Sequence, residues 1–335
     1  MLCILFNPLQ TQIVRSVSVN PWINQAIEEY LLRQISEGQV LLFLWQNKNS
    51  VLMGRNQNPW KECRISLLEE ENGKLARRIS GGGTVYQDEG NLNFAFMTPK
   101  KLYNLKRQFD VILQALKDLS IEAQRSGQSD LTIDGFKFSG NAFYLPRGLA
   151  CHHGTLLIDT DLNRLTRYLQ PSTETIKGKG IQSRRSNVMN LNQIRKGLTV
   201  ETMMEGLKGS FVRIYGGTAQ EVQVDENNYG ISDLMEKFSS WDWRYGLTPT
   251  FEMVLHHDFP WGAFRIDLHI VKGRIDMITI ESDELKGPSI QELNLPMGKD
   301  PFTKETLIQY FRGVDCFPEN SVRDDVLKWI MTRDI

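Results

Sequence analysis

The sequence predicts a mixed α/β fold of the α+β type, with a large mixed β-sheet domain flanked by helices and a small C-terminal α/β domain. Three observations predict it. The 335 residues exceed what one compact core usually serves. Apolar runs typical of strands alternate with segments of helical periodicity. An aromatic stretch at 241–246 and a Thr-Pro-Thr break at 248–250 mark a boundary, so we assign 1–246 to the large domain and 250–335 to the small one.

The large domain is expected to start with a strand at 11–18 and a helix opened by Asn20-Pro21, since Asn suits the N-cap and Pro the first turn. Its apolar stripe would comprise Trp22, Ala26, Tyr30 and Leu31. Further strands are predicted at 40–45, 50–55, 75–79, 91–97 and 150–158, and helices at 58–72, 104–119, 162–169, 199–214 and 231–238.

Two tight hairpins are predicted from turn residues between alternating segments. Asp134-Gly135 is a strong hairpin signal and puts Lys137 on a strand two residues after the turn. Lys272-Gly273 does the same in the small domain, between 264–271 and 274–280, before helices at 303–311 and 322–332. The segment 172–187 is polar, basic and interrupted by glycines, so we expect a mobile loop there.

Composition excludes several classes of protein. A net charge of −1 gives no global basic field for nucleic acid. No apolar run approaches the roughly 20 residues needed to span a bilayer, and the apolar start at 2–6 is too short for a signal h-region. The four cysteines, Cys3, Cys63, Cys151 and Cys316, form no CxxC pair, which favours a reducing cytoplasm over a disulfide framework.

The stretch from Arg77 to Asp88 is the main candidate for chemistry. Two arginines lead into Gly81-Gly82-Gly83, and a β-prone segment follows. Consecutive bare N–H groups can form an anion-binding concavity, to which the arginines add charge. This pattern suits a carboxylate or a phosphate, and the alternative is a hairpin loop with solvated arginines. It is neither a P-loop nor a dinucleotide fingerprint, because no Gly-Lys-Ser/Thr and no helix follow.

Other candidate side chains lie on predicted strands. Lys137 is opposite both Phe136 and Phe138, so it faces either solvent or a cleft suited to phosphate. His152 and His153 point to opposite faces of one strand and are poorly placed to share a metal ion. The basic residues of 177–185 form either a solvated charge run or a lid over a nucleotide.

A series of motifs carries a resemblance to a known family. In chain order they are Gly54-Arg55-Asn56-Gln57-Asn58-Pro59-Trp60-Lys61-Glu62-Cys63, Arg77-Arg78-x-Ser80-Gly81-Gly82-Gly83-x-Val85, Gly90-Asn91-x-Asn93, Asp130-Leu131, Lys137-x-Ser139-Gly140-x-Ala142, His152-His153-Gly154-Thr155-Leu156-Leu157 and Lys179-Gly180-Ile181-x-Ser183-x-Arg185-Ser186. Through them the chain resembles the lipoate–protein ligase A and lipoyltransferase family over nearly the whole large domain. The resemblance implies a biotin/lipoate ligase-like catalytic domain followed by an accessory domain.

The family resemblance implies a two-step reaction. Lipoate and MgATP give lipoyl-adenylate and pyrophosphate, and a lysine of an acceptor protein then takes the lipoyl group and releases AMP. The implied acceptors are lipoyl domains of E2 subunits of 2-oxoacid dehydrogenases and the glycine cleavage H protein. Lys137 and Arg78 match catalytic positions, and Asp130 matches one near Mg²⁺. The lipoate- and adenylate-binding positions are Trp45, Arg78, Ser80, Gly81, Gly82, Gly83, Thr84, Val85, Gln87, Asn91, Asp130, Lys137, Ser139, Gly140, His153, Gly154, Thr155, Lys179, Gly180, Ile181 and Arg185.

Two positions differ from the family pattern, and alternative functions remain open. Gln87 stands where relatives commonly have His, so no acid/base role transfers to it, and Tyr144 stands where some ligases have Arg. The related octanoyltransferases use a cysteine nucleophile, and Cys151 beside two histidines is the candidate for one, although a buried structural cysteine is commoner. A lipoyltransferase that accepts only preformed lipoyl-adenylate is a second alternative. A non-catalytic lipoyl- or biotin-binding module would not need Arg78, Lys137 and a basic lid.

Overall fold

A computed structural model describes residues 9–170, 174–184, 186–217, 220–282, 293–296, 300–314 and 317–335. The described chain forms two compact units. Unit 1 is drawn from Met1–Arg55, Gly73–Thr166 and Arg184–Ser239, and unit 2 from Asn56–Asn72, Arg167–Ser183 and Ser240–Ile335. Unit 2 therefore contains two segments that the sequence analysis assigned to the large domain, in addition to the C-terminal part. Cys3, Cys316 and Arg185 lie outside the described residues.

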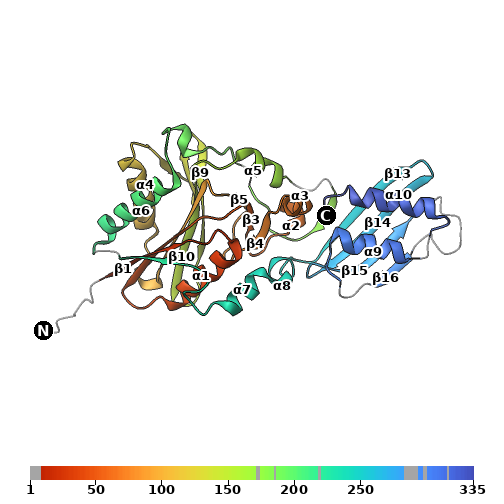
Figure 1. Cartoon of the computed structure of the whole chain (residues 1–335), viewed down its shortest axis with the longest axis horizontal. Helices are drawn as coiled ribbons and strands as arrows, with labels where there is room; N and C mark the ends of the chain where they lie inside the picture. Colours follow the sequence, from red (N-terminus) through yellow and green to blue (C-terminus); the bar gives the residue numbers. More distant parts are fainter. Residues whose placement is uncertain are drawn as a thin grey trace. The chain divides into compact units, whose positions relative to one another are not determined.

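Unit 1 is built on an eight-stranded mixed sheet of order β12-β1-β2-β6-β10-β9-β8-β7 (Figure 1). The strands β12, β1 and β2 are parallel, and the pairs from β2 to β7 are antiparallel. Their bounds are β1 Gln10–Ser16, β2 Gln39–Trp45, β6 Asn91–Pro99, β7 Gln124–Ser126, β8 Asp130–Ile133, β9 Phe136–Tyr144, β10 Leu149–Leu157 and β12 Gln220–Val224. The predicted mixed sheet is confirmed.

Helices cover both faces of this sheet. Figure 1 shows α4 (Leu105–Asp118) and α6 (Val200–Tyr215) together on one side, with α1 (Pro21–Gln34) and α7 (Ser232–Ser239) on the other. The continuous apolar run of β2 follows from this arrangement, because alternate residues of a strand face opposite sides and here both sides are covered. Leu42 and Leu44 pack in the core that α4 and α6 close. Asn20 caps α1 as predicted, accepting from the Trp22 N–H.

A smaller three-stranded sheet of unit 1 carries the glycine loop. Its order is β4-β3-β5, with β3 Ser50–Met53, β4 Lys74–Arg77 and β5 Val85–Gln87. β3 pairs with β4 in parallel and with β5 antiparallel. The triple glycine therefore spans the connection between two strands that flank a third, rather than a simple hairpin turn.

Unit 2 contains a five-stranded sheet of order β11-β13-β14-β15-β16, whose strands are Thr175–Gly178, Phe251–Phe259, Gly262–Val271, Arg274–Glu281 and Leu293–Pro296. Trp60 of α2 packs against Tyr245, Phe251 and Phe302 with ring centroids 5.2–5.3 Å apart. These aromatic contacts join segments 185 to 242 positions apart in the chain. The helices are α2 Pro59–Glu62, α3 Ile65–Glu70, α8 Trp241–Arg244, α9 Lys304–Gly313 and α10 Asn320–Met331; α5 Leu162–Tyr168 leads from unit 1 into unit 2.

Most predicted elements are confirmed within two or three residues, and both hairpins are present, with positive φ at Asp134, Gly135, Lys272 and Gly273. One prediction is partly wrong: residues 175–178 of the expected loop form β11, which pairs with β13. β7, β12, β13 and β16 were not predicted. Short 3-10 turns occupy Lys100–Leu102 and Leu191–Gln193. Among the described residues, none of the helices is both long and apolar enough to cross a bilayer.

Candidate functional site

Arg78 holds the glycine loop together from inside. It is only 6% exposed, and its guanidinium donates to the carbonyl oxygens of Gly81 (2.8 Å from Nη2), Gly83 (2.7 Å from Nη2) and Leu52 (3.2 Å from Nη1). Burial lowers the Arg78 pKa to about 10, an effect opposed by the charge of Glu28. The alternative of a loop with solvated arginines is wrong, because Arg77 is buried too and donates to the Arg55 carbonyl.

The glycines allow the loop to pack this closely. Gly82 has φ +93°, and a Cβ there would lie 2.8 Å from Arg78 Nη2. A Cβ on Gly54, at the end of β3, would lie 2.1 Å from the Gly82 carbonyl oxygen. At both positions a side chain would displace backbone or the guanidinium, so glycine is required for the observed path. A Cβ on Gly82 would also lie 3.6 Å from the Cβ of Ala142, so the loop lies close to β9 of the large sheet.

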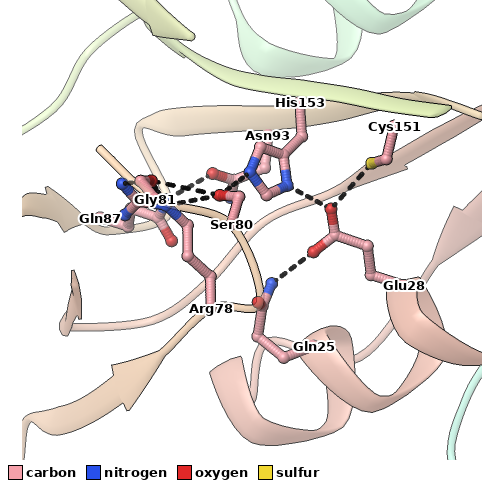
Figure 2. Close-up of polar contacts among 9 residues, drawn as sticks. All are labelled: Gln25, Glu28, Arg78, Ser80, Gly81, Gln87, Asn93, Cys151 and His153. Atoms are coloured by element: carbon pink, nitrogen blue, oxygen red, sulfur yellow. Dashed lines mark hydrogen bonds and ion pairs between the residues drawn. The ribbon is translucent and has the colours of Figure 1, made fainter. Parts of the chain in front are cut away.

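A buried hydrogen-bond chain runs from this loop to α1 (Figure 2). Arg78 Nε lies 3.1 Å from Ser80 Oγ, and Ser80 Oγ lies 2.6 Å from His153 Nε2. His153 Nδ1 is in turn paired with Glu28 Oε1. The four side chains come from β4 and its loop, from β10 and from α1, and each is less than 9% exposed.

Glu28 is the end of this chain and was not identified from the sequence. It also accepts from Gln25 Nε2 (2.7 Å to Oε2) and from the Cys151 thiol (3.7 Å to Oε1). Burial and the Glu28 charge raise the Cys151 pKa well above its ordinary value, so this thiol is protonated at neutral pH. The spacing of Gln25 and Glu28, three apart on a helix, was a signal that both share one face.

A β-bulge in β9 places Lys137 on the face of the large sheet that is next to the glycine loop. Leu131 pairs with Ser139 but Thr132 pairs with Lys137, so Phe138 is an extra residue on β9. The bulge keeps Phe138 in the core. It also leaves Lys137 close to Gly140, because a Cβ added to Gly140 would lie 3.1 Å from the Lys137 Cε. Lys137 Nζ forms a half-buried ion pair with Asp130 (2.9 Å), the two side chains being 25% and 31% exposed.

The two adjacent histidines face opposite sides of β10, as predicted. His153 lies toward α1, whereas His152 is fully buried on the α4 side. His152 Nδ1 lies 3.1 Å from Gln108 Oε1 and its Nε2 lies 2.9 Å from Asn141 Oδ1. Burial, followed by the neighbouring His153 and Arg125, lowers the His152 pKa well below its ordinary value. Its ring contacts those of Phe94, Phe96, Phe109 and Phe143.

A cluster of amides lies behind the start of β6. Gln87 Nε2 donates to Asn93 Oδ1 (2.6 Å) and Gln87 Oε1 accepts from Asn47 (2.5 Å). Gln87 is thus a buried structural amide. Asn91 Oδ1 and Trp45 Nε1 are buried without a hydrogen-bond partner among the described residues. Both residues belong to the predicted binding set.

Two family models match the chain. Residues 20–212 match the one described as lipoyl protein ligase A/B catalytic domain, and residues 248–330 match the one described as bacterial lipoate protein ligase C-terminus. The chain belongs to the lipoyl protein ligase A/B family. The predicted resemblance is confirmed.

Individual relatives agree with this membership. A lipoate-protein ligase A of Psychrobacter cryohalolentis is 34% identical over 334 residues, which are 96% of this chain and 98% of the relative. The crystal structure of P. falciparum LipL1 in complex with lipoate is 27% identical, has a TM-score of 0.63 and covers 96% of this chain and 100% of its own. A lipoate-protein ligase A bound with ATP shares the fold at 20% identity, with a TM-score of 0.62 over 71% of this chain and 99% of its own.

In this member of the ligase family, the predicted site residues fall into both units. The unit 1 residues described above are brought together around one face of β9 and β10. Thr155 lies beside them, and its Oγ1 accepts from the Gly140 N–H. Ser139 and Gly154 instead face the α4 side beside Asn141, from which Ser139 Oγ accepts, so the structure does not bring these two predicted residues to the same face. Thr84 and Val85 continue the glycine loop into β5.

The predicted residues Lys179, Gly180 and Ile181 belong to unit 2, where they are exposed. Their segment is tied to α2 and the residues before it. Gln57 Nε2 donates to Ser183 Oγ (3.0 Å) and to the Ile181 carbonyl (3.3 Å). Ser183 donates from both N and Oγ to Glu62, whose pKa burial raises. The segment is thus held within unit 2.

The family resemblance implies a Mg²⁺ ion, and the residues around Lys137 include a possible ligand for it. Mg²⁺ takes oxygen ligands and usually uses one or two carboxylates together with substrate phosphates. Asp130 supplies such a carboxylate, half-exposed and beside a cation. Among the described residues the one cluster of three potential ligands is Glu28, Cys151 and His153, a nitrogen- and sulfur-containing set that does not suit Mg²⁺. Asp130 therefore fits the ion as a single protein ligand.

Proposed function

We propose that this protein is a lipoate–protein ligase. It activates lipoate with ATP to lipoyl-adenylate and then transfers the lipoyl group to a lysine of an acceptor domain. Family membership over both parts of the chain supports this proposal, as does a full-length relative named lipoate-protein ligase A. The related structures that hold lipoate and ATP indicate the two substrates.

The observation that carries the proposal is the position of Lys137 and the Arg78-held loop on one face of β9. A Cβ on Gly140 would lie 3.1 Å from Lys137 Cε, and a Cβ on Gly82 would lie 3.6 Å from the Cβ of Ala142, two residues further along the same strand as Gly140. The ammonium and the loop N–H groups therefore border a common surface. Forming an acyl-adenylate brings a carboxylate against an α-phosphate, and these two anions repel each other, so fixed cations and N–H donors at one surface suit the reaction.

In the first step a lipoate carboxylate oxygen bonds to the α-phosphorus and the bond to pyrophosphate breaks. Lys137 would stabilise the charge that builds on the phosphate oxygens, and Asp130 keeps the ammonium in place until the nucleotide arrives. The glycine loop would donate N–H groups to the acyl group. Asp130 would also hold Mg²⁺, which neutralises phosphate charge when bound.

In the second step the acceptor amine nitrogen bonds to the acyl carbon, AMP leaves as the anion and the amine loses a proton. The acceptors we propose are lipoyl domains of E2 subunits and the glycine cleavage H protein. An archaeal ligase of the same fold is described together with its E2 lipoyl domain. We place the reaction in the cytoplasm, which agrees with Cys63 and Cys151 being buried thiols outside any disulfide.

The cysteine-dependent octanoyltransferase is disfavoured by the Cys151 thiol. A nucleophilic cysteine needs a lowered pKa and access to the substrate. This thiol is fully buried beside the Glu28 carboxylate, and burial first and the Glu28 charge second raise its pKa. The transferase that uses only preformed lipoyl-adenylate differs from the ligase in its use of ATP and has to be separated by experiment.

The deciding experiment incubates the protein with lipoate, ATP and Mg²⁺ without an acceptor. A ligase releases pyrophosphate in proportion to lipoate and accumulates lipoyl-adenylate, which mass spectrometry identifies. Omitting lipoate is the matched control and should stop pyrophosphate release. Transfer from synthetic lipoyl-adenylate, without any pyrophosphate released from ATP, would instead establish the transferase.

A further inference from the structure

A buried carboxylate lies behind the glycine loop and has no part in the two steps above. Glu28 is fully buried on α1, and a charge in that position is tolerated when donors and an opposite charge surround it. We propose that Glu28 is a positioning residue of the ligase reaction: through His153 and Ser80 it fixes the Arg78 guanidinium and the loop that Arg78 holds. This inference rests on the proposed function.

The direction of each hydrogen bond follows from what the groups can do. A guanidinium only donates, so Ser80 Oγ accepts from Arg78 Nε at 3.1 Å. The hydroxyl proton then has two acceptors within reach, His153 Nε2 at 2.6 Å and the Gly81 carbonyl at 3.3 Å. The closer of the two is His153 Nε2, which accepts this proton only when it carries none of its own.

Glu28 is the group that keeps His153 Nε2 free. A carboxylate only accepts, so its contact with His153 Nδ1 places the imidazole proton on Nδ1. In a neutral imidazole the other nitrogen is then an acceptor. Gln25, which donates to Glu28 Oε2 at 2.7 Å, holds the carboxylate in the orientation this needs. With a neutral His153, the chain has a single proton arrangement from Arg78 to Glu28 (Figure 2).

Without Glu28 the chain could reverse. A proton on His153 Nε2 would be donated to Ser80, which would turn its own proton to the Gly81 carbonyl. That oxygen already accepts from Arg78 Nε (3.1 Å) and Nη2 (2.8 Å). The new donor would compete with the guanidinium for the carbonyl that sets the loop. Removing Glu28 also removes the anion that opposes the effect of burial on Arg78.

The experiment combines a spectroscopic and a kinetic reading on three full-length variants. Nitrogen-15-labelled histidine in a chain with five histidines gives resolvable ring-nitrogen signals, and His153→Gln identifies those of His153. Glu28→Leu removes the acceptor. Glu28→Gln keeps an acceptor oxygen and the volume but removes the charge. Glu29→Gln is the matched control, since Glu29 is the adjacent carboxylate of α1 and pairs with Arg33 and Lys237 outside the chain.

We expect the wild-type protein and Glu29→Gln to carry the His153 proton on Nδ1. In Glu28→Leu the proton moves to Nε2 and kcat for lipoyl-adenylate formation falls on the order of 100-fold, with little change in KM for ATP, because the loop acts on the reacting acyl group. Glu28→Gln keeps the tautomer and loses on the order of 10-fold in kcat.

Two results would overturn the inference: a wild-type His153 protonated on Nε2, or full kcat in both Glu28 variants. The spectroscopic reading needs no turnover. A wild-type protein that forms no adenylate would therefore contradict the proposed function, while the His153 signals still decide whether Glu28 sets the proton arrangement. If Glu28→Leu does not fold, the kinetics of Glu28→Gln decide, with wild-type kcat in that variant counting against the proposal.

Discussion

We expect unit 1 to lose stability as the pH falls below 6.5, because His152 resists protonation in the folded protein. Its ring is fully buried among four phenylalanines, and its two nitrogens lie beside the side-chain amides of Gln108 (3.1 Å) and Asn141 (2.9 Å), each of which can donate or accept. Burial lowers its pKa well below the ordinary value of 6.5. In the unfolded chain the imidazole takes a proton near 6.5, whereas in the folded protein it stays neutral, so acid favours unfolding.

The magnitude follows from one proton taken up on unfolding. The free energy of unfolding falls by up to about 1.4 kcal/mol per pH unit between 6.5 and the folded pKa of His152. From pH 6.5 to pH 5.5 the loss should be about 1.0 kcal/mol, because the unfolded imidazole is only half protonated at pH 6.5. Asp88 of unit 1 opposes this loss, since burial raises its pKa, so the comparison has to be made between variants.

The assay is urea unfolding at pH 7.5, 6.5 and 5.5. Hydrogen exchange in peptides of β10 serves as the readout, so that the unfolding of unit 1 itself is measured. His152→Gln keeps a polar side chain beside Gln108 and Asn141 but cannot be protonated. It should be less stable at pH 7.5 and lack the acid-dependent loss. His256→Gln, at an exposed position of β13, is the control and should keep the wild-type slope. Equal slopes in wild type and His152→Gln would refute the reasoning.

Four further predictions concern the site and the units. Lys137→Ala should lower adenylation and transfer roughly 100- to 1,000-fold with an unchanged circular dichroism spectrum, whereas the exposed Lys117→Ala on α4 should not; wild-type adenylation in Lys137→Ala would exclude its assigned role. Cys151 should resist alkylation at pH 8 until the protein unfolds, because burial raises its pKa, and Cys151→Ser should keep most activity; an acylated Cys151 detected by mass spectrometry would favour the transferase. Gly54→Ala should lower the melting temperature and activity together, because its Cβ would lie 2.1 Å from the Gly82 carbonyl oxygen, while Gly209→Ala, in open space on α6, should stabilise by about 0.5–1 kcal/mol; a Gly54→Ala variant with wild-type stability would contradict the contact. A fragment of residues 1–246 should expose Trp60 and aggregate, because it lacks Phe251 and Phe302; a monomeric, fully folded fragment in circular dichroism and size exclusion would be the opposite result.

Most helices and strands and the glycine loop could be predicted from the sequence, because the signals for them are local. Asp134-Gly135, the apolar run of β2 and the triple glycine each act through neighbouring residues. The bulge at Phe138 could not be predicted from the sequence, because it depends on pairing between β8 and β9. Simple alternation gave the correct face for Lys137 relative to Phe138 but could not place it beside Gly140.

The partners of Arg78 were also beyond sequence reasoning. The arginine was identified, yet its contacts with loop carbonyls and the path to Glu28 join β4, β10 and α1. Whether Arg78 also touches a ligand stays a prediction. The basic segment was interpreted from composition as a loop, and β11 formed because β13 offers an edge at a distance of about 75 residues along the chain. Long-range pairing of this type leaves no local signal.

The division of unit 2 into three stretches has a consequence for how the protein is made. Unit 1 needs nothing after Ser239, so its sheet can close once β12 has left the ribosome. Trp60 and β11 are synthesised long before Phe251 and the rest of their sheet. At about 5–20 residues per second, the stretch from Ser240 to Ile335 takes about 5–20 s to make. During that time the early segments of unit 2 present an aromatic side chain and an unpaired strand edge to the cell, so nascent chains of this enzyme should be chaperone clients between the completion of one unit and the other.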